Sequence, residues 1–154
     1  MLTDKDIRVG NWFLANATYG NDKYVEVQNI YNDAINIYEN YRDAVDVGVF
    51  IDRLTPIPIT TNKLEECGMK KLPFLDTICY GFYYCRHREN EPHQTFAVVQ
   101  SKKLPDEWEA VVQSNRNKMR VSLNSIQYIH QLQNLVFDIT GTELKFNFGK
   151  VEST

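Results

Sequence analysis

The sequence predicts an α+β fold that is mainly antiparallel β, with a small N-terminal SH3-like barrel or curled sheet and then a β-meander covered by a C-terminal amphipathic helix. Three observations predict this class. Short runs of alternating apolar and polar residues recur along most of the chain, as they do in half-buried strands. Pro56 and Pro58 interrupt the pattern. Near the end, apolar residues recur at steps of three and four, which is typical of one helix face.

The N-terminal part is predicted to hold four or five short strands. The ranges 9–15, 23–31, 34–40 and 45–51 are rich in β-branched and aromatic residues, and short polar turns lie between them. In 45–51 every second residue is valine or isoleucine, which places one apolar face on a sheet. Several short strands in so small a segment favour a curled antiparallel sheet or an SH3-like barrel.

A subdomain boundary is predicted near Pro58. The string LTPIPIT carries two prolines one residue apart, and they hold the backbone extended and exclude a helix. We therefore expect a β-rich subdomain at 1–58 and a second subdomain at 59–154. The second begins with a short helix, which Thr60 or Thr61 caps and Gly68 ends.

The middle of the chain is predicted to form an antiparallel meander. The ranges 76–88, 94–101, 107–113 and 118–123 contain strand-forming residues, and polar turns separate them. Regular strands of this kind, each followed by a turn, pair with their neighbours in order.

A helix is predicted to begin at Asn124 or Ser125 and to end at Gly141, where a left-handed C-terminal residue belongs. Its apolar stripe is formed by Ile126, Ile129, Leu132, Val136 and Ile139. Such a stripe suits one face of a sheet. The range 142–148 is a candidate for a last strand.

The other side of this predicted helix carries a stripe of polar residues with almost no charge. Gln127, His130, Gln131, Asn134 and Asp138 also follow steps of three and four. Solvated helix faces usually carry lysine and glutamate, whereas amides lose water at lower cost than charges. Three interpretations stay open: a solvated face, a cover for polar backbone of the N-terminal sheet, and a surface for a protein partner or a second copy. These five residues are the candidate partner contacts.

Four strings resemble one uncharacterised family of small proteins from gut bacteria and their prophages or mobile elements. They are IRVGNWF, LTPIPIT, GMKK and IQYIHQLQNLVFDITGTEL. The resemblance implies a β-rich N-terminal piece, a short helix, a variable meander and a C-terminal helix. It also implies a phage-related context, and it supplies no activity.

The overall charge limits the class of partner. A net charge of −3 and a pI of about 5.6 disfavour general binding to DNA or anionic lipid, because both need a positive field. The alternative of a nucleic-acid accessory protein depends on a local basic cluster, Arg116, Lys118 and Arg120. Tyr38 and Tyr41 would then stack on bases.

No metal site is predicted. Cys79, Cys85, His87 and His93 form a C-x5-C-x-H-x5-H string. On a regular strand the two cysteines would lie about 20 Å apart, too far to share one tetrahedral zinc.

No catalytic residue or cofactor is predicted either. Cys67 is placed at the C-terminal end of the first helix, where the helix dipole disfavours a thiolate. The sequence has neither a G-x-S-x-G elbow nor a glycine-rich phosphate loop.

Cysteine usage and hydropathy predict a cytoplasmic protein. Three cysteines are too few for a disulfide scaffold. The first residues lack the pattern of a secretory signal, and no apolar run approaches the roughly 20 residues that span a bilayer. We expect a non-enzymatic interaction protein of phage or mobile-element type that binds a protein partner or a second copy of itself. We do not expect it to bind a membrane.

Overall fold

The computed structural model describes the chain in seven segments: 2–15, 23–31, 34–39, 46–50, 54–73, 77–84 and 94–146. The fold is α+β, with antiparallel strands in two sheets and a C-terminal helix. Two compact units contain these elements: Met1–Ile57 with Tyr128–Asn134 and Lys145–Thr154, and Pro58–Gln127 with Leu135–Leu144. The chain passes from one unit to the other between Ile57 and Pro58, and the C-terminal helix contributes residues to both.

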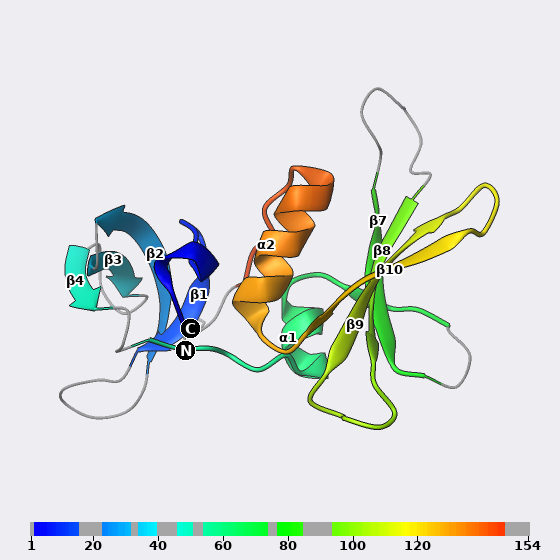
Figure 1. The fold of residues 1–154 in the computed structure, drawn as a ribbon, viewed down its shortest axis with the longest axis horizontal. Helices are drawn as coiled ribbons and strands as arrows, with labels where there is room; N and C mark the ends of the chain where they lie inside the picture. The colour runs from blue at the N-terminus through cyan, green and yellow to red at the C-terminus, as the bar shows by residue number, and fades with distance from the viewer. Residues whose placement is uncertain are drawn as a thin grey trace, which may run out of the picture. The chain divides into compact units, whose positions relative to one another are not determined.

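The first unit contains an open antiparallel sheet with the strand order β4-β3-β2-β1-β5 (Figure 1). A short 3-10 helix, η1 (Asp4–Asp6), precedes it. The strands are β1 (Trp12–Ala15), β2 (Lys23–Tyr31), β3 (Ala34–Glu39), β4 (Asp46–Phe50) and β5 (Leu54–Thr55). Because β4 and β5 are opposite edges of the described sheet, a closed SH3-like barrel is not confirmed.

The alternation predicted for β2 is confirmed by burial. Val25 and Val27 are buried, whereas Tyr24 and Glu26, which alternate with them, are partly exposed. Phe13 of β1 lies opposite Val25 and is fully buried. A single apolar cluster results, formed by Ile7, Phe13, Ala15, Val25, Val27 and Leu54.

The second unit contains a meander in which each strand pairs with the next, in the order β10-β9-β8-β7-β6. This confirms the predicted meander for the described residues. Its elements are α1 (Thr61–Glu66), β6 (Lys70–Lys71), β7 (Cys79–Tyr84), β8 (Gln94–Gln100), β9 (Trp108–Ser114) and β10 (Arg120–Ile126). The short edge strand β6 was not predicted, because two residues are too few to show a period.

Helix α1 confirms the predicted cap and terminator. The hydroxyl of Thr60 accepts a hydrogen bond from the Lys63 amide at 3.3 Å, and Gly68 adopts a φ of 90° just after the last turn. Leu64 is fully buried. The Tyr80 hydroxyl donates to Glu65 at 2.9 Å, so α1 lies on the sheet face that carries Tyr80.

The two faces of the second sheet differ in side-chain size. Phe96 and Trp108 lie on the same face as Tyr80 and are fully buried. The opposite face carries a cluster of smaller residues, Cys79, Ala97, Val99 and Val111, with Leu72 packed against it. Gly81 lies in the middle of this face, opposite Ala97.

The predicted start of the C-terminal helix is wrong. Helix α2 spans Ile129–Thr140, and the residues before it continue β10, where Ile126 lies opposite Trp108. A β-bulge between Ser122 and Ser125 lets the strand follow β9 for these extra residues. Ile126 is therefore buried as the last residue of strand β10, and it is not part of helix α2.

The apolar side of α2 is buried as predicted. Ile129 and Leu132 are fully buried, and Val136 is almost so. Gly141 ends the helix with a φ of 70°. Within the described segments, residues 142–146 form no strand, so this part of the predicted last strand is not found.

We expect Gly81→Ala to destabilise the second unit. A Cβ atom at this position would lie 2.4 Å from the carbonyl oxygen of Phe96 and 2.9 Å from a Leu72 methyl carbon, so β7 and β8 would have to move apart. The free energy of unfolding in urea should fall by about 1–3 kcal/mol. Tyr83→Thr, at an exposed position of the same strand, should change it by less than about 0.5 kcal/mol. Equal effects of the two substitutions would contradict the close contact at Gly81.

Candidate interaction surface

Gln133 of α2 binds the backbone that leads into β1. Its Oε1 atom accepts a hydrogen bond from the Trp12 amide at 3.0 Å, and its Nε2 atom donates to the Gly10 carbonyl at 3.0 Å. A side-chain amide offers a donor and an acceptor in one plane, as a peptide group does. The Gln133 side chain therefore makes the two hydrogen bonds that a neighbouring strand would otherwise make. It is almost completely buried.

Asn134 continues this contact toward the N-terminus. Its Oδ1 atom accepts from Asn11 Nδ2 at 2.9 Å and from Arg8 Nε at 3.1 Å. Its Nδ2 atom donates to the Asp6 carbonyl at 3.1 Å. Of the five residues of the amide stripe, Asn134 thus bonds polar groups of the first unit, as one of the three open interpretations expects.

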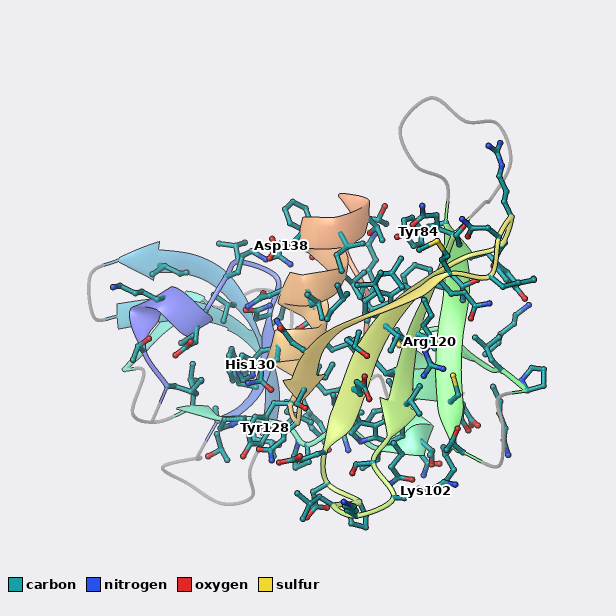
Figure 2. The ribbon with its side chains drawn as sticks, turned by 45° about the vertical axis from the view of Figure 1, so that its right-hand side comes forward. Tyr84, Lys102, Arg120, Tyr128, His130 and Asp138 are labelled. Carbon is teal, nitrogen blue, oxygen red and sulfur yellow. The ribbon has the colours of Figure 1, made fainter. Side chains whose placement is uncertain are left out.

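His130 lies in the core of the first unit and is only 3% exposed. Its ring is 4.9 Å from that of Phe13 and is stacked on Tyr128 at 6.0 Å (Figure 2). Within the described segments Nδ1 makes no hydrogen bond. Burial lowers the pKa of His130 to about 4, against a smaller opposing effect of Asp6. The ring is therefore neutral near pH 7.

The other three candidate contacts are more accessible. Gln131 is half-buried and accepts from the Tyr128 amide at 3.1 Å, ahead of the first turn of α2. Gln127 is half-buried, and its Nε2 atom lies 3.4 Å from Glu107 Oε1. Asp138 is exposed. A role for the five residues in partner binding stays a prediction.

Gln133 is the residue of this surface that the sequence-based prediction missed. It lies four residues after Ile129 and three before Val136, which places it on the apolar side. A glutamine among buried aliphatic residues is itself a signal, because a buried amide needs partners for both its donor and its acceptor.

The hairpin between β9 and β10 gathers the predicted basic cluster. Arg116, Lys118 and Arg120 are all exposed. The turn is fixed by hydrogen bonds from the Lys118 amide to the Ser114 carbonyl at 2.9 Å and from the Ser114 amide to the Met119 carbonyl at 2.8 Å. Lys118 adopts a φ of 58°, the left-handed conformation that closes such a turn.

Two exposed apolar side chains lie among these charges. Met119 is 66% exposed and Val121 is 56% exposed. β10 begins at Arg120 and Met119 directly precedes it. Side chains alternate along an extended chain, so Met119 and Val121 lie on one side while Arg120 and Ser122 lie on the other. Arg120 lies over the strands of the second sheet (Figure 2). We call Met119, Arg120, Val121 and Ser122 the β10 edge segment.

The tyrosines of the nucleic-acid alternative are not placed by the structure. Tyr41 lies outside the described residues, and the side chain of Tyr38 in β3 is likewise outside them. The basic part of that alternative, by contrast, is gathered on one hairpin.

The described cysteines are not set up as nucleophiles. Burial raises the pKa of Cys67 to about 11, and its thiol donates to the Leu64 carbonyl at 3.0 Å. Burial also raises the pKa of Cys79, against a smaller effect of Arg120. Cys85, His87 and His93 lie outside the described residues. In the part of the chain that the structure describes, no cluster of three or more histidine, cysteine, aspartate or glutamate side chains could hold a metal ion.

Comparisons with protein-family models, with curated proteins and with solved structures find no match to this chain. None of the helices in the described segments is long and apolar enough to cross a membrane.

We expect Gln133→Met to lower the free energy of unfolding by about 2 kcal/mol. Methionine keeps the shape but leaves the Trp12 amide and the Gly10 carbonyl without the bonds that they make to Gln133. Asp138→Ala on the exposed side of the same helix should change it by less than about 0.5 kcal/mol. Urea unfolding at neutral pH measures both, and wild-type stability of the methionine variant would contradict the role of the amide.

The buried ring of His130 predicts a pH dependence of stability. Its pKa is about 4 in the folded protein and about 6.5 in an unfolded chain, so the unfolded state binds the proton first. Stability is full above pH 6.5 and falls by up to about 3 kcal/mol as the pH drops to 4. His130→Leu should remove this slope.

Asp6→Asn is the matched control for the histidine experiment. Hydrogen bonds from Thr3 lower the pKa of Asp6 below its usual 3.8, so this carboxyl titrates below the window and the slope should remain. Urea unfolding at a series of pH values measures how the free energy of unfolding of each variant depends on pH. An unchanged slope in His130→Leu would contradict a neutral buried ring.

Proposed function

We propose that this protein is a non-enzymatic accessory protein that binds a protein partner through the β9–β10 hairpin. The observation that carries the proposal is the β10 edge segment, where exposed apolar side chains alternate with basic or polar ones at the end of a sheet. Exposed apolar groups beside a strand edge are what protein partners use, since burying them and pairing the edge both favour association.

The amide side of α2 is a weaker candidate for the contact. His130 is buried and the amide of Asn134 is held by Arg8 and Asn11. A partner could reach Gln131 and Asp138 without breaking that network, so these residues stay secondary candidates. A cytoplasmic location, a phage or mobile-element origin and an SH3-like character of the first sheet remain predictions.

The second candidate function is nucleic-acid binding, and it is favoured by the exposure of Arg116, Lys118 and Arg120 on one hairpin. Such a cluster can neutralise backbone phosphates. The net charge of −3 and the apolar Met119 and Val121 between the basic residues weigh against it, because a phosphate backbone offers nothing for apolar groups to contact.

Photo-crosslinking in the native host tests the two candidates. We would place p-benzoylphenylalanine at Val121 and, as a matched control, at Leu104, which is 55% exposed and lies in the β8–β9 loop. We expect discrete protein adducts from position 121 and few or none from position 104, because only the first adjoins a strand edge. Adducts to nucleic acid at position 121 would favour the second candidate. Identical adducts from both positions, or none from either, would contradict a binding surface on the hairpin.

A further inference from the structure

We infer that the β10 edge segment takes up an extended segment of the partner as an added strand, and that this segment alternates acidic and apolar residues. The inference rests on the proposed function and specifies its partner. Three properties of the edge define it: its position in the sheet, the alternation of its side chains and the sign of its charge.

The position of β10 comes from the sheet order. β9 pairs with it on one side, and no strand in the described part of the chain pairs with the other side. A strand edge presents main-chain donors and acceptors, and a partner in extended conformation can pair with them. Val111, Val112 and Gln113 of β9 hold β10 in register from Arg120 to Ser122, so the outer side is already a straight template.

The alternation of side chains sets the pattern of the partner. On one face, Met119 and Val121 are exposed and apolar; on the other, Arg120 is exposed and basic, and the Ser122 hydroxyl donates a hydrogen bond to the Glu109 carboxylate. Side chains directly opposite each other on neighbouring strands make contact. An added strand therefore needs apolar residues on the first face and an acidic residue beside Arg120 on the second, so that the two kinds alternate.

The charge favours an acidic segment over a second copy of this chain as the occupant. In a parallel arrangement of two β10 edges, Arg116, Lys118 and Arg120 of both copies would lie together, and like charges repel across a strand pair. In an antiparallel arrangement the edge segment of the second copy would offer no carboxylate to Arg120. An acidic segment has the opposite effect, because its carboxylates meet these side chains with complementary charge.

The length of the docked segment is limited by the bulge. The register of β10 shifts between Ser122 and Ser125, and a bulge bends a strand and interrupts straight pairing. Before it, the turn ends at Lys118. The docked segment is consequently short, about as long as the β10 edge segment itself.

A titration followed by NMR tests the inference on the full-length protein. The probe is a synthetic peptide that alternates glutamate and valine, added to millimolar concentration to isotope-labelled protein. We expect chemical-shift changes of the backbone amides in β10 and β9 and slower hydrogen exchange in β10. Arg116→Glu combined with Arg120→Glu should weaken binding about tenfold or more, because it replaces attraction by repulsion.

Three controls make the result specific. Lys102→Glu with Lys103→Glu makes the same charge change in the exposed β8–β9 loop, at the end of the sheet away from the hairpin (Figure 2), and should leave binding unchanged. A peptide that alternates lysine and valine should not bind. The glutamate–valine peptide with alternate backbone nitrogens methylated should also fail, because it cannot pair with an edge.

The outcomes separate this inference from the proposed function. Absence of shifts in β10 with the acidic peptide, or equal binding by the methylated peptide, overturns strand addition. If Val121 still crosslinks to a protein in either case, the proposed function stands and the mode of binding is wrong. Binding of a single-stranded oligonucleotide that Arg116→Glu with Arg120→Glu abolishes, and that Val121→Ser leaves unchanged, overturns the peptide partner in favour of nucleic acid.

Discussion

Every buried peptide group needs a hydrogen-bond partner, and at the start of β1 a helix side chain supplies it. β5 pairs only with Leu14 and Ala15, so the strand ladder on that side stops short of the residues before them. At these residues the side chain of Gln133 accepts a hydrogen bond from the Trp12 amide and donates one to the Gly10 carbonyl. The first sheet thus depends on a residue 121 positions later in the chain, and the part of helix α2 up to Asn134 belongs to that unit.

This constraint explains why amides, and no charged groups, occupy positions 133 and 134 of α2. A buried carboxylate could accept hydrogen bonds but not donate one to a carbonyl, whereas Gln133 and Asn134 must do both. Losing water also costs an amide far less than an ion. The absence of charge is therefore a property of an internal contact here, and a neutral helix stripe need not face another molecule.

Much of the fold could be predicted because strands and caps leave local signals. Alternation of apolar and polar residues predicts β2 and β9, and the threonine–glycine pair around α1 predicts that helix. The start of α2 could not be predicted in this way. Ile126, Ile129 and Leu132 follow a helical step of three, but Ile126 points inward from β10 because a bulge realigns the strand with Trp108. A step of three in the sequence therefore cannot distinguish the first residue of a helix from a buried residue at the end of the preceding strand.

Only the residue types of the candidate site could be predicted from the sequence, and its position at a sheet edge could not. The sequence shows Arg116, Lys118 and Arg120 as a basic cluster, and that composition alone suggests phosphates. The structure adds that β10 is an edge strand. Met119 and Val121 then lie on one side of the edge and Arg120 and Ser122 on the other, so the apolar residues become candidate contacts as well. Edge position depends on which strands pair, and that is set by contacts far apart in sequence. A charge cluster in a strand should therefore be interpreted only after its place in the sheet is known.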